Sequence, residues 1–462
     1  MSATDPGSDP RPPVPTPGNG IGAVLARPQF SLLVAGQTVS QLGDRLHNMA
    51  LIALIGTAAQ VNTSGIELAK LVSAITLPVV LFGPVVGALV DRWNKHLTMI
   101  LCDLLRAIIV AFIPLVYRTI GYIWPVYVFA FAVALLGVFF NAAKMALIPD
   151  LVHRAQLLSA NAALTSVGRV ATVFGIVGGG LMIEWTIWGR FGWTGYEAGF
   201  YIDALSYTIS VITLVLMTML SAAYARRAAV HFSGTEAAQV VRREMAHLAS
   251  DMRQTLGLIR SNRDLRFVFF TVVLLGFLAA AIFVIMTASV QTVLGEGTRG
   301  VGYLGGLLAA GMVVGSLAVG TVGKNWERRS LVLGGCCLMG TLMVLCGIQY
   351  SFAVFVPVSF LGGLVLAPVM VAQDTLIHEA APAADLALIF STRDLVLGAA
   401  FMGGAIVVGS GIPVLGALGA DEPYRLALFV LGVLISAAAL GGIAMVLRDQ
   451  RTAGRNSAQQ RS

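Results

Sequence analysis

Polar and ionisable side chains inside otherwise apolar stretches are the residues of this chain that could do chemistry. Near the N terminus such side chains recur at spacings of three or four residues, at Gln37, Gln41, Asp44 and Asn48, with Arg45 just beside that line. Residues spaced in this way share one face of a helix. Surroundings of low dielectric constant favour the neutral form of a carboxyl group, so Asp44 is the leading candidate for binding a proton. The alternative is a static Asp44 that pairs with a nearby basic residue.

Two further polar residues stand apart in apolar runs. Arg169 has no carboxylate within its own helical turn, so it either holds an anionic group of a substrate or pairs with Asp44. Gln291 is expected to face the outer end of a cavity. Polar groups inside a membrane are costly and usually face a cavity or one another, which makes both residues candidates for substrate binding or coupling.

Two pairs of opposite charge are close together in the chain. Asp103 and Arg106 lie three residues apart, a spacing typical of a local structural bridge on a helix. Arg393 and Asp394 are adjacent, so their side chains point to different sides of a helix. We expect Arg393 to serve contacts between the two halves of the molecule more than chemistry, and it stays in the set of candidate coupling residues.

The signatures of common enzymes are missing from the sequence. It contains no Gly-x-x-x-x-Gly-Lys-Ser/Thr loop, no His-Glu-x-x-His pair and no Gly-x-Ser-x-Gly elbow. The cysteines lie in apolar runs without the spacing of a metal site or a disulfide framework, at Cys102, Cys336, Cys337 and Cys346. We therefore expect no enzymatic activity, no catalytic residues, no metal, no cofactor and an energy source other than ATP.

These residues must be positioned by elements that lie in lipid. The chain of 462 residues is 57% hydrophobic and only 11% charged, whereas a soluble domain carries about 25% charged residues. A membrane-spanning helix needs about 20 mainly apolar residues. Twelve such runs occur, at about 29–56, 66–90, 98–117, 123–143, 162–188, 199–222, 267–292, 301–322, 331–349, 352–373, 388–413 and 424–447. The sequence therefore predicts an all-α integral membrane protein.

The distribution of Lys and Arg predicts the orientation of the twelve spans. If both termini are cytoplasmic, 21 of the 30 basic residues fall on the cytoplasmic side and four on the other. Membrane proteins show this bias. We expect a monomeric multi-pass protein of the cell (inner) membrane, in contact with the lipid bilayer. The net charge of +7 is spread over short connections, which argues against a nucleic-acid partner.

Five segments are expected along the chain. Residues 1–28 and 448–462 are polar and predict disordered cytoplasmic tails. Residues 29–222 and 267–447 hold six spans each and predict two six-helix bundles. The connection 223–266 predicts a cytoplasmic linker, and its stretch 236–259 alternates charged and apolar residues at helical spacing. That stretch is either an amphipathic helix on the inner leaflet or a solvated linker.

The two halves contain an internal repeat. Residues 87–96 follow the second span and residues 320–329 follow the eighth, and the segments align when Trp93 is set on Trp326. Duplicated halves joined by a long connection are typical of transporters in which one half rocks against the other.

The stretch 83–95, with Asp91 and Arg92, resembles the signature between helices two and three of the major facilitator superfamily. Residues 103–107, 141–162 and 203–207 are similar to its branch of macrolide-efflux proteins and siderophore exporters, and part of 141–162 is shared with a lysophospholipid transporter family. This resemblance implies twelve transmembrane helices in two six-helix halves and transport by alternating access. Ile176 stands where antiporters of the superfamily carry a proline, although the glycines that favour tight packing remain.

The signature predicts a gate at the cytoplasmic side. Gly83 and Gly87 are about one helical turn apart and favour a close approach of another helix. A carboxylate at Asp91 is placed to meet the positive N-terminus of a helix, which by the resemblance is the eleventh, beginning near residues 384–388. The second copy of the repeat has Lys324 at the position of Asp91 and is not expected to make that contact.

Basic residues complete the predicted gate. Arg92 and Lys95 are expected to reach an acidic partner, for which Asp150 is the candidate. Together with Asp91 they would latch the cytoplasmic side when the cavity opens outward. The alternative is that these charges only anchor the orientation of the chain in the membrane.

Three functions stay open at this stage. The favoured one is proton-coupled efflux of a small amphipathic compound, such as a drug, a macrolide or a siderophore-like molecule, because a largely apolar cavity with few charges suits such a substrate. The first alternative is transport of lysophospholipid between leaflets. The second is a membrane scaffold or sensor that transports nothing.

Overall fold

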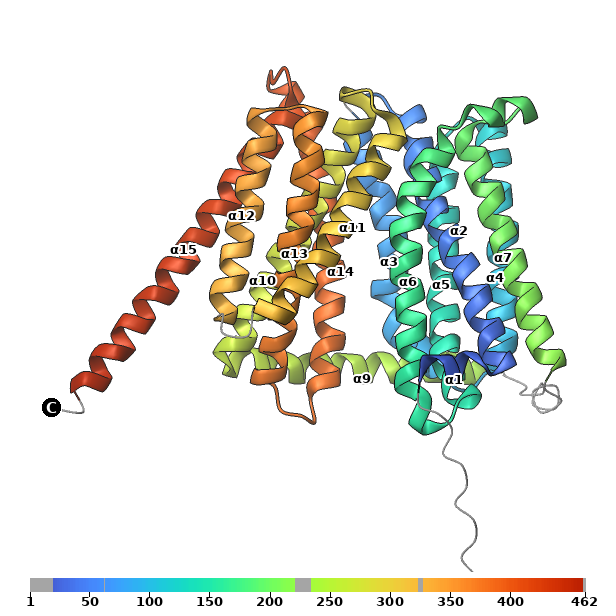
Figure 1. The fold of residues 1–462 in the computed structure, drawn as a ribbon, viewed down its shortest axis with the longest axis horizontal. Coiled ribbons are helices and arrows are strands. Elements are labelled where there is room, and N and C mark those ends of the chain that lie inside the picture. Colours follow the sequence, from blue (N-terminus) through green and yellow to red (C-terminus); the bar gives the residue numbers. More distant parts are fainter. Residues whose placement is uncertain (1–19, 62, 221–233, 323–326, 460–462) are drawn as a thin grey trace, which may run out of the picture.

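The computed structural model describes residues 20–61, 63–220, 234–322 and 327–459. Two groups of six long helices stand side by side (Figure 1). The first half contains α2 (Pro28–Ala58), α3 (Ser64–Val90), α4 (Lys95–Ile120), α5 (Trp124–Leu151), α6 (Leu157–Ile183) and α7 (Gly195–Met219). The second half contains α10 (Arg263–Ala288), α11 (Gly297–Val322), α12 (Arg328–Ile348), α13 (Phe352–Ala380), α14 (Leu386–Ala417) and α15 (Pro423–Gln459).

Eleven of these twelve helices are long and apolar enough to cross a membrane. The exception in the described part of the chain is α2, which has 31 residues but carries the polar residues found at its middle in the sequence. Other helices replace lipid around much of α2, and its side chains from Met49 to Ile55 are all buried. The prediction of an all-α membrane protein with twelve long helices is confirmed.

Helix α4 shows how the bundle faces its surroundings. Its exposed apolar side chains recur at helical spacing, at Leu97, Leu101, Leu104, Leu105, Ile108, Phe112 and Leu115. Its charged residues Asp103 and Arg106 are buried on the opposite side. A soluble helix has the reverse pattern, so this arrangement fits a helix whose outer face lies in lipid.

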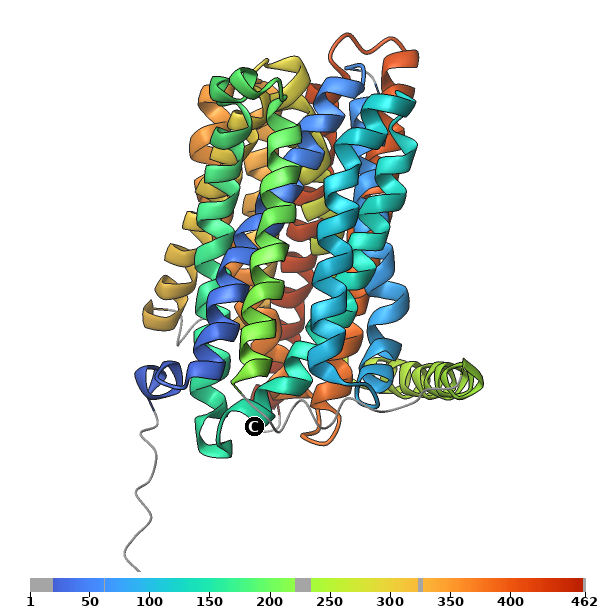
Figure 2. The same ribbon diagram turned by 90° about the vertical axis from the view of Figure 1, so that its right-hand side faces the viewer.

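Two helices cross one end of the bundle. α1 (Ile21–Leu25) and α9 (Gly234–Ser261) lie across the bottom of the molecule in Figures 1 and 2, roughly perpendicular to the long helices. α9 contacts α3, α10 and α14, and Gln254 Nε2 donates a hydrogen bond of 3.0 Å to Asp385 Oδ1. We call this end the α9 end and the opposite one the far end. α9 covers the stretch for which the sequence predicts an amphipathic helix.

The chain termini differ from the predicted tails. Residues 1–19 and 460–462 lie outside the described part of the chain, as do linker residues 221–233. Within the described part, α15 continues as a helix to Gln459, so a disordered tail from Arg448 is wrong for that stretch. The segment contains no proline, and its polar residues are compatible with a helix that has already begun.

The two halves contact each other closely at the far end. There α6 packs on α11 through Gly180 and Gly302, where a Cβ on Gly302 would lie 3.0 Å from the Cα of Gly180. The Tyr424 side chain is buried beside the start of α3, and its hydroxyl lies 2.7 Å from Ser64 Oγ. Small residues and buried hydrogen bonds are what hold helices together in a membrane.

Candidate functional site

Ionisable residues that are buried or half-buried gather between α2, α4, α5 and α7 in the first half. We call them the polar cluster; they are Asp44, His47, Asp103, Arg106, Lys144, Asp203 and Tyr207. Sequence positions more than a hundred residues apart meet here because four helices of the half turn their polar faces inward. Such residues are costly within a membrane and usually functional.

Asp44, the leading candidate from the sequence, faces α7. Its Oδ1 accepts a hydrogen bond from the Tyr207 hydroxyl. The Tyr207 ring in turn packs against the Arg106 guanidinium, 5.1 Å from ring centroid to Cζ. Asp44 therefore takes part in a network instead of standing alone on its helix.

Arg106 is enclosed by groups of three helices. Its Nη1 lies 3.4 Å from Asp103 Oδ1, which confirms the local bridge predicted from their spacing. Its Nε donates to the Val133 carbonyl at 3.3 Å, and the Phe140 ring lies 5.6 Å away on a second side. Carboxylate, carbonyl and aromatic faces together stabilise a buried guanidinium.

His47 and Asp203 form a second buried pair one turn along α2. His47 Nδ1 lies 3.2 Å from Asp203 Oδ2, with exposed side-chain fractions of 6% and 0%. Ser206 donates a hydrogen bond of 3.2 Å to Asp203 Oδ1. The edge of the Phe200 ring covers the imidazole at a centroid distance of 5.3 Å. The pair is thus buried, with Ser206 and Phe200 against it.

Lys144 of α5 lies at the more open side of the cluster. Its ammonium group donates to Gln37 Oε1 at 3.1 Å and to Asn141 Oδ1 at 2.8 Å. It also lies 5.8 Å from the Phe140 ring centroid. Gln37 and Lys144 therefore join α2 to α5, as Asp44 and Tyr207 join α2 to α7.

The other candidates on α2 face α6 or are half-buried. Gln41 and Arg45 lie against α6, where a Cβ on Gly168 would meet Gln41 Oε1 at 2.7 Å and one on Gly175 would meet Arg45 Cβ at 2.6 Å. Asn48 is half-buried. The tight packing predicted for the glycines of α6 is confirmed at Gly168, Gly175, Gly179 and Gly180 and is wrong for Gly178, where a Cβ would meet nothing within 4 Å.

Arg169 does not pair with Asp44. It is exposed on α6, whereas Asp44 faces α7. The pairing considered from the sequence is therefore wrong, because α2 turns its carboxylate toward α7 and away from the exposed side of α6. The remaining hypothesis, that Arg169 holds an anionic group of a substrate, stays a prediction.

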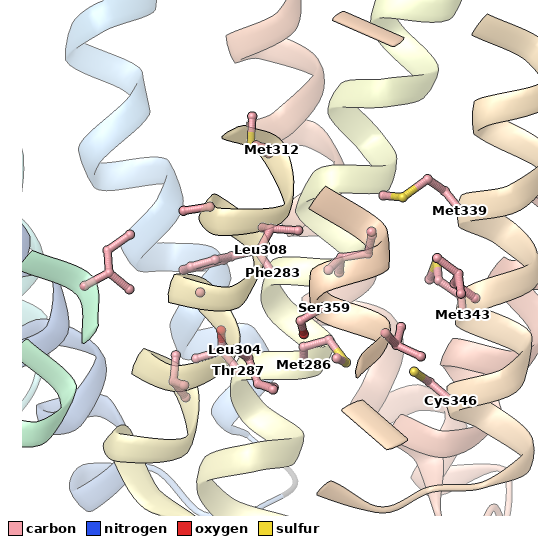
Figure 3. Close-up of a pocket in the computed structure, with 18 of the residues that line it drawn as sticks. Phe283, Met286, Thr287, Leu304, Leu308, Met312, Met339, Met343, Cys346 and Ser359 are labelled. Carbon is pink, nitrogen blue, oxygen red and sulfur yellow. The ribbon is translucent and has the colours of Figure 1, made fainter. Parts of the chain in front are cut away.

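An apolar cavity of about 350 Å³ lies between α2 and α6 of the first half and helices of the second half (Figure 3). The first half contributes Met49, Ile52, Thr172 and Ile176. Methionine side chains recur around the cavity, at Met49, Met286, Met312, Met339 and Met343. The lining hydroxyl groups are those of Thr172, Thr287 and Ser359, and no charged side chain from the described part of the chain lines the cavity. The polar cluster and the cavity are therefore separate sites that share helix α2.

Gln291 lies between the halves at the far end. Its Nε2 donates 3.0 Å hydrogen bonds to the Ile52 carbonyl of α2 and to Thr298 Oγ1 of α11. It belongs to η3 (Ser289–Val293), one turn of π-helix that ends α10. Gln291 does not line the cavity, but its hydrogen bond joins the end of α10 to α2, a helix that does.

Arg393 makes its ion pairs within the second half. Its Nη2 lies 3.0 Å from Asp374 Oδ1 of α13, and its Nη1 lies 3.1 Å from Asp394 Oδ1. These ion pairs do not join the halves, and a role of Arg393 in contacts between the halves stays a prediction. The long guanidinium reaches both carboxylates because Asp374 is on the neighbouring helix, which the adjacency of Arg393 and Asp394 did not reveal.

The predicted gate residues contact α5 of their own half. Lys95 Nζ lies 3.2 Å from Asp150 Oδ2 and donates to the Ala146 carbonyl at 2.8 Å, so the predicted Lys95–Asp150 contact is present. Trp93 stacks on Phe139 at 5.6 Å. These contacts attach the connection after α3 to α5; their role in gating stays a prediction.

The glycines of the signature do not make the close approach expected of them. A Cβ on Gly83 or Gly87 would have nothing within 4 Å. Asp91 and Arg92 are exposed. The signature glycines thus do not pack against the opposite half. Helix α14 approaches α3 at Gly65 and Gly409 toward the far end, and a Cβ on Gly398 would lie 3.3 Å from Val80 Cγ2. Lys324 and Trp326 of the second repeat lie outside the described residues.

Of the polar cluster, the sequence analysis names only Asp44 as a functional group. It gives Asp103 and Arg106 a structural bridge and gives no role to His47, Lys144, Asp203 and Tyr207. The sequence does contain signals for some of them. His47 lies one helical turn after Asp44, and Asp203 and Tyr207 are four residues apart and so share a helix face. The missing information was that α7 pairs with α2, which no local spacing reveals. Among the described residues, no group of three or more His, Cys, Asp or Glu is placed to hold a metal.

Comparison with known proteins identifies relatives. The family model described as Major Facilitator Superfamily matches residues 33–391. Macrolide efflux protein A of Streptococcus pyogenes is 23% identical over 387 residues, which cover 82% of this chain and 88% of the relative. An uncharacterised MFS-type transporter of Bacillus subtilis is 30% identical over 186 residues, which span 40% of this chain and 41% of that relative.

Solved structures share the fold. A bacterial homologue of the human lysosomal transporter Spinster, inward-facing and unoccupied, has a TM-score of 0.63 at 13% identity and covers 90% of this chain and 95% of that one. A bacterial homologue of the iron transporter ferroportin, also inward-facing, has a TM-score of 0.62 at 13% identity, with 90% and 98% coverage. At these identities the likeness concerns the fold alone.

Proposed function

This chain belongs to the Major Facilitator Superfamily, and from that membership we propose a secondary active transporter that exports small amphipathic compounds in exchange for protons. The proposal places it in the cell membrane with both termini cytoplasmic, as the distribution of Lys and Arg favours. The α9 end is then the cytoplasmic end.

The observation that supports the substrate class best is the apolar cavity. Its volume of about 350 Å³ lies within the range of small-molecule sites. Methionine side chains are flexible and polarisable, so they adapt to apolar surfaces of different shapes. A sugar or an amino acid would leave many polar groups unsatisfied there, whereas a drug-like or macrolide-like compound would bury its apolar surface. The macrolide efflux relatives agree with this substrate class.

Alternating access is supported by the unequal contacts between the halves. The far end is held by the Gly180–Gly302 approach and by Tyr424, while the signature glycines at the α9 end have open space beside them. With the α9 end in the cytoplasm, this is an inward-facing arrangement. In the outward-facing one, the signature would pack against the second half and Asp91 would meet the start of α14.

Proton coupling is proposed for the polar cluster. Asp44 lies on α2, the helix whose residues Met49 and Ile52 line the cavity. Its hydrogen bond to Tyr207 links it to Arg106, so a change in its protonation alters contacts between α2, α4 and α7. That is the type of coupling by which a proton biases the position of a cavity-lining helix.

Inverted membrane vesicles test the proposal, with labelled erythromycin as the probe and respiration making the lumen acidic. We expect accumulation that collapses when nigericin removes the pH gradient and that falls by about 5- to 150-fold in Asp44→Asn, the range of typical coupling energies. Asp421→Asn is the control, because Asp421 is exposed in the connection before α15. Accumulation that ignores both nigericin and Asp44→Asn would contradict proton-coupled export.

The alternatives give different results in the same vesicles. Uptake of labelled lysophosphatidylethanolamine without a gradient, and no movement of erythromycin, would favour the lysophospholipid transporter. Movement of neither compound, nor of other amphipathic drugs in a panel, would favour a scaffold or sensor.

A further inference from the structure

The polar cluster holds more carboxylates than permanent cations. Its acids are Asp44, Asp103 and Asp203; Arg106 is its permanent cation, and Lys144 is a second base that can carry a positive charge. Lys144 is within electrostatic range of Asp44 and Asp103. If all three acids are ionised, at least one negative charge stays without a counterpart from Arg106 or Lys144. An uncompensated charge in a buried site is strongly unfavourable, so the cluster favours one additional proton.

The contacts indicate where that proton can bind. Asp103 lies beside Arg106, and Asp44 accepts from Tyr207, whose ring packs on the same guanidinium. Asp203 is fully buried, and the basic group at its side is the imidazole of His47, 3.2 Å away. Asp203 is therefore the acid whose counter-charge comes from a group, the His47 imidazole, that can gain and lose its positive charge.

We propose that His47 and Asp203 form the site that binds the transported proton, with Asp44 acting as the neighbouring acid through which it enters or leaves. This inference rests on the proposed proton-coupled export. When the proton is bound, the His47 imidazole becomes an imidazolium paired with the Asp203 carboxylate. When the proton leaves, a neutral imidazole remains beside a carboxylate that Ser206 supports by a hydrogen bond.

The surroundings of the pair agree with this role. From α2 the other charged group facing α7 is Asp44, from α4 they are Asp103 and Arg106, and from α5 it is Lys144; α7 adds Tyr207. On α6, Arg169 is exposed. The pair also lies close to the cavity along the chain, because His47 precedes the cavity-lining Met49 by two residues on α2.

Two transport modes separate a proton-binding role from a structural one. Accumulation of erythromycin against a gradient needs proton release, whereas exchange of labelled for unlabelled erythromycin at equal pH on both sides does not. For His47→Asn we expect gradient-driven accumulation to fall by about 5- to 150-fold while exchange stays within about twofold of the unmodified protein. The control is His96→Asn, a buried histidine of the same half that hydrogen-bonds Thr218; it should keep both modes.

Three outcomes decide the proposal. If His47→Asn accumulates erythromycin as well as the unmodified protein does, the proposed role of the His47–Asp203 pair is overturned. If Asp44→Asn has lost accumulation in the same test, proton-coupled export itself still stands. If the variant does not fold, NMR of labelled histidine in the unmodified protein decides: the ring signals of His47 must change between about pH 5 and pH 8, and constant signals overturn the proposal. If accumulation by the unmodified protein does not depend on the pH gradient, the proposed function itself is contradicted.

Discussion

At the scale of single residues, Gly43 shows how closely α2 and α7 are packed around the polar cluster. A Cβ at this position would lie 2.0 Å from Ser206 Oγ and 2.5 Å from Asp203 Oδ1. No side chain fits in that space. The missing methyl group of Gly43 therefore allows the Asp203 carboxylate to reach the backbone of α2 and the His47 imidazole beyond it.

We expect Gly43→Ala to lower stability by about 1–3 kcal/mol, the usual cost of overpacking a core. The thermal midpoint of the purified protein in detergent measures the loss. Gly178→Ala is the control, because a Cβ there meets nothing within 4 Å. An equal effect of both substitutions would show that the approach at Gly43 is not tight.

Contacts between neighbours in sequence could be predicted from the sequence, and contacts between distant helices could not. Asp103 and Arg106 were correctly paired because an interval of three fixes their geometry on any helix. The Asp44–Tyr207 bond joins residues 163 positions apart, and only the packing of α2 on α7 creates it. Arg393 shows the same limit: its neighbour Asp394 is visible in the sequence, and its second partner Asp374 is not.

At the scale of elements, the contact between α6 and α11 closes the far end. Gly180 and Gly302 bring the two backbones together, and a Cβ on Gly302 would lie 3.0 Å from the Ile176 carbonyl as well. Ile176 occupies the position of the proline expected in antiporters, and α6 runs without a break from Leu157 to Ile183. A continuous helix with glycines on one face is what permits this contact.

We expect Gly302→Val to separate α6 from α11 at the far end. Overpacking at this contact costs about 1–3 kcal/mol. Each 1.4 kcal/mol changes the ratio of the conformations with the far end closed and open about tenfold. Spin labels at the exposed far-end positions Tyr122 and Leu418 should report a longer distance. Gly178→Val, at an exposed glycine of α6 where a Cβ would meet nothing within 4 Å, should leave the distance unchanged. A longer distance in this control would point to a general loosening.

The elements themselves were predictable because lipid imposes a minimum length on them. All twelve apolar runs became long helices, including the pair separated only by residues 349–351. The helical end of the chain was not predictable, because a helix that has begun continues through polar residues that have no helical signal of their own. The glycines of the signature were misjudged for another reason. Under the proposed alternating access, the helix end in contact changes with the conformation, and one sequence serves several conformations.

At the scale of the whole molecule, one hydroxyl group joins the halves. Tyr424 is 2% exposed; its hydroxyl donates to the Val61 carbonyl at 2.8 Å, accepts from the Gly65 N–H at 3.2 Å and lies 2.7 Å from Ser64 Oγ. All three partners belong to the first half and Tyr424 to the second. Opening of the far end must break this group of bonds together.

We expect Tyr424→Phe to make the far end open more often, because the bonded groups lose about 1–3 kcal/mol of stabilisation when a buried partner is removed. A cysteine introduced at Ala69, which is buried beside Gly409, should react faster with a maleimide in this variant when the native cysteines have been replaced. Tyr303→Phe, at a half-exposed tyrosine of α11, should not change the rate. Equal rates in all three proteins would show that Tyr424 does not hold this end.

The polar face of α2 has a consequence for the synthesis of the protein. An Asp or Arg at the centre of a helix costs about 2.5–3.5 kcal/mol during insertion by the translocon, and α2 carries both near its middle. Its compensating partner Tyr207 follows 163 residues later, roughly ten to thirty seconds of translation at 5–20 residues per second. During that interval α2 depends on other helices or on an insertase for shelter. A nascent chain that stops before α7 should therefore expose its first long helix to membrane quality control.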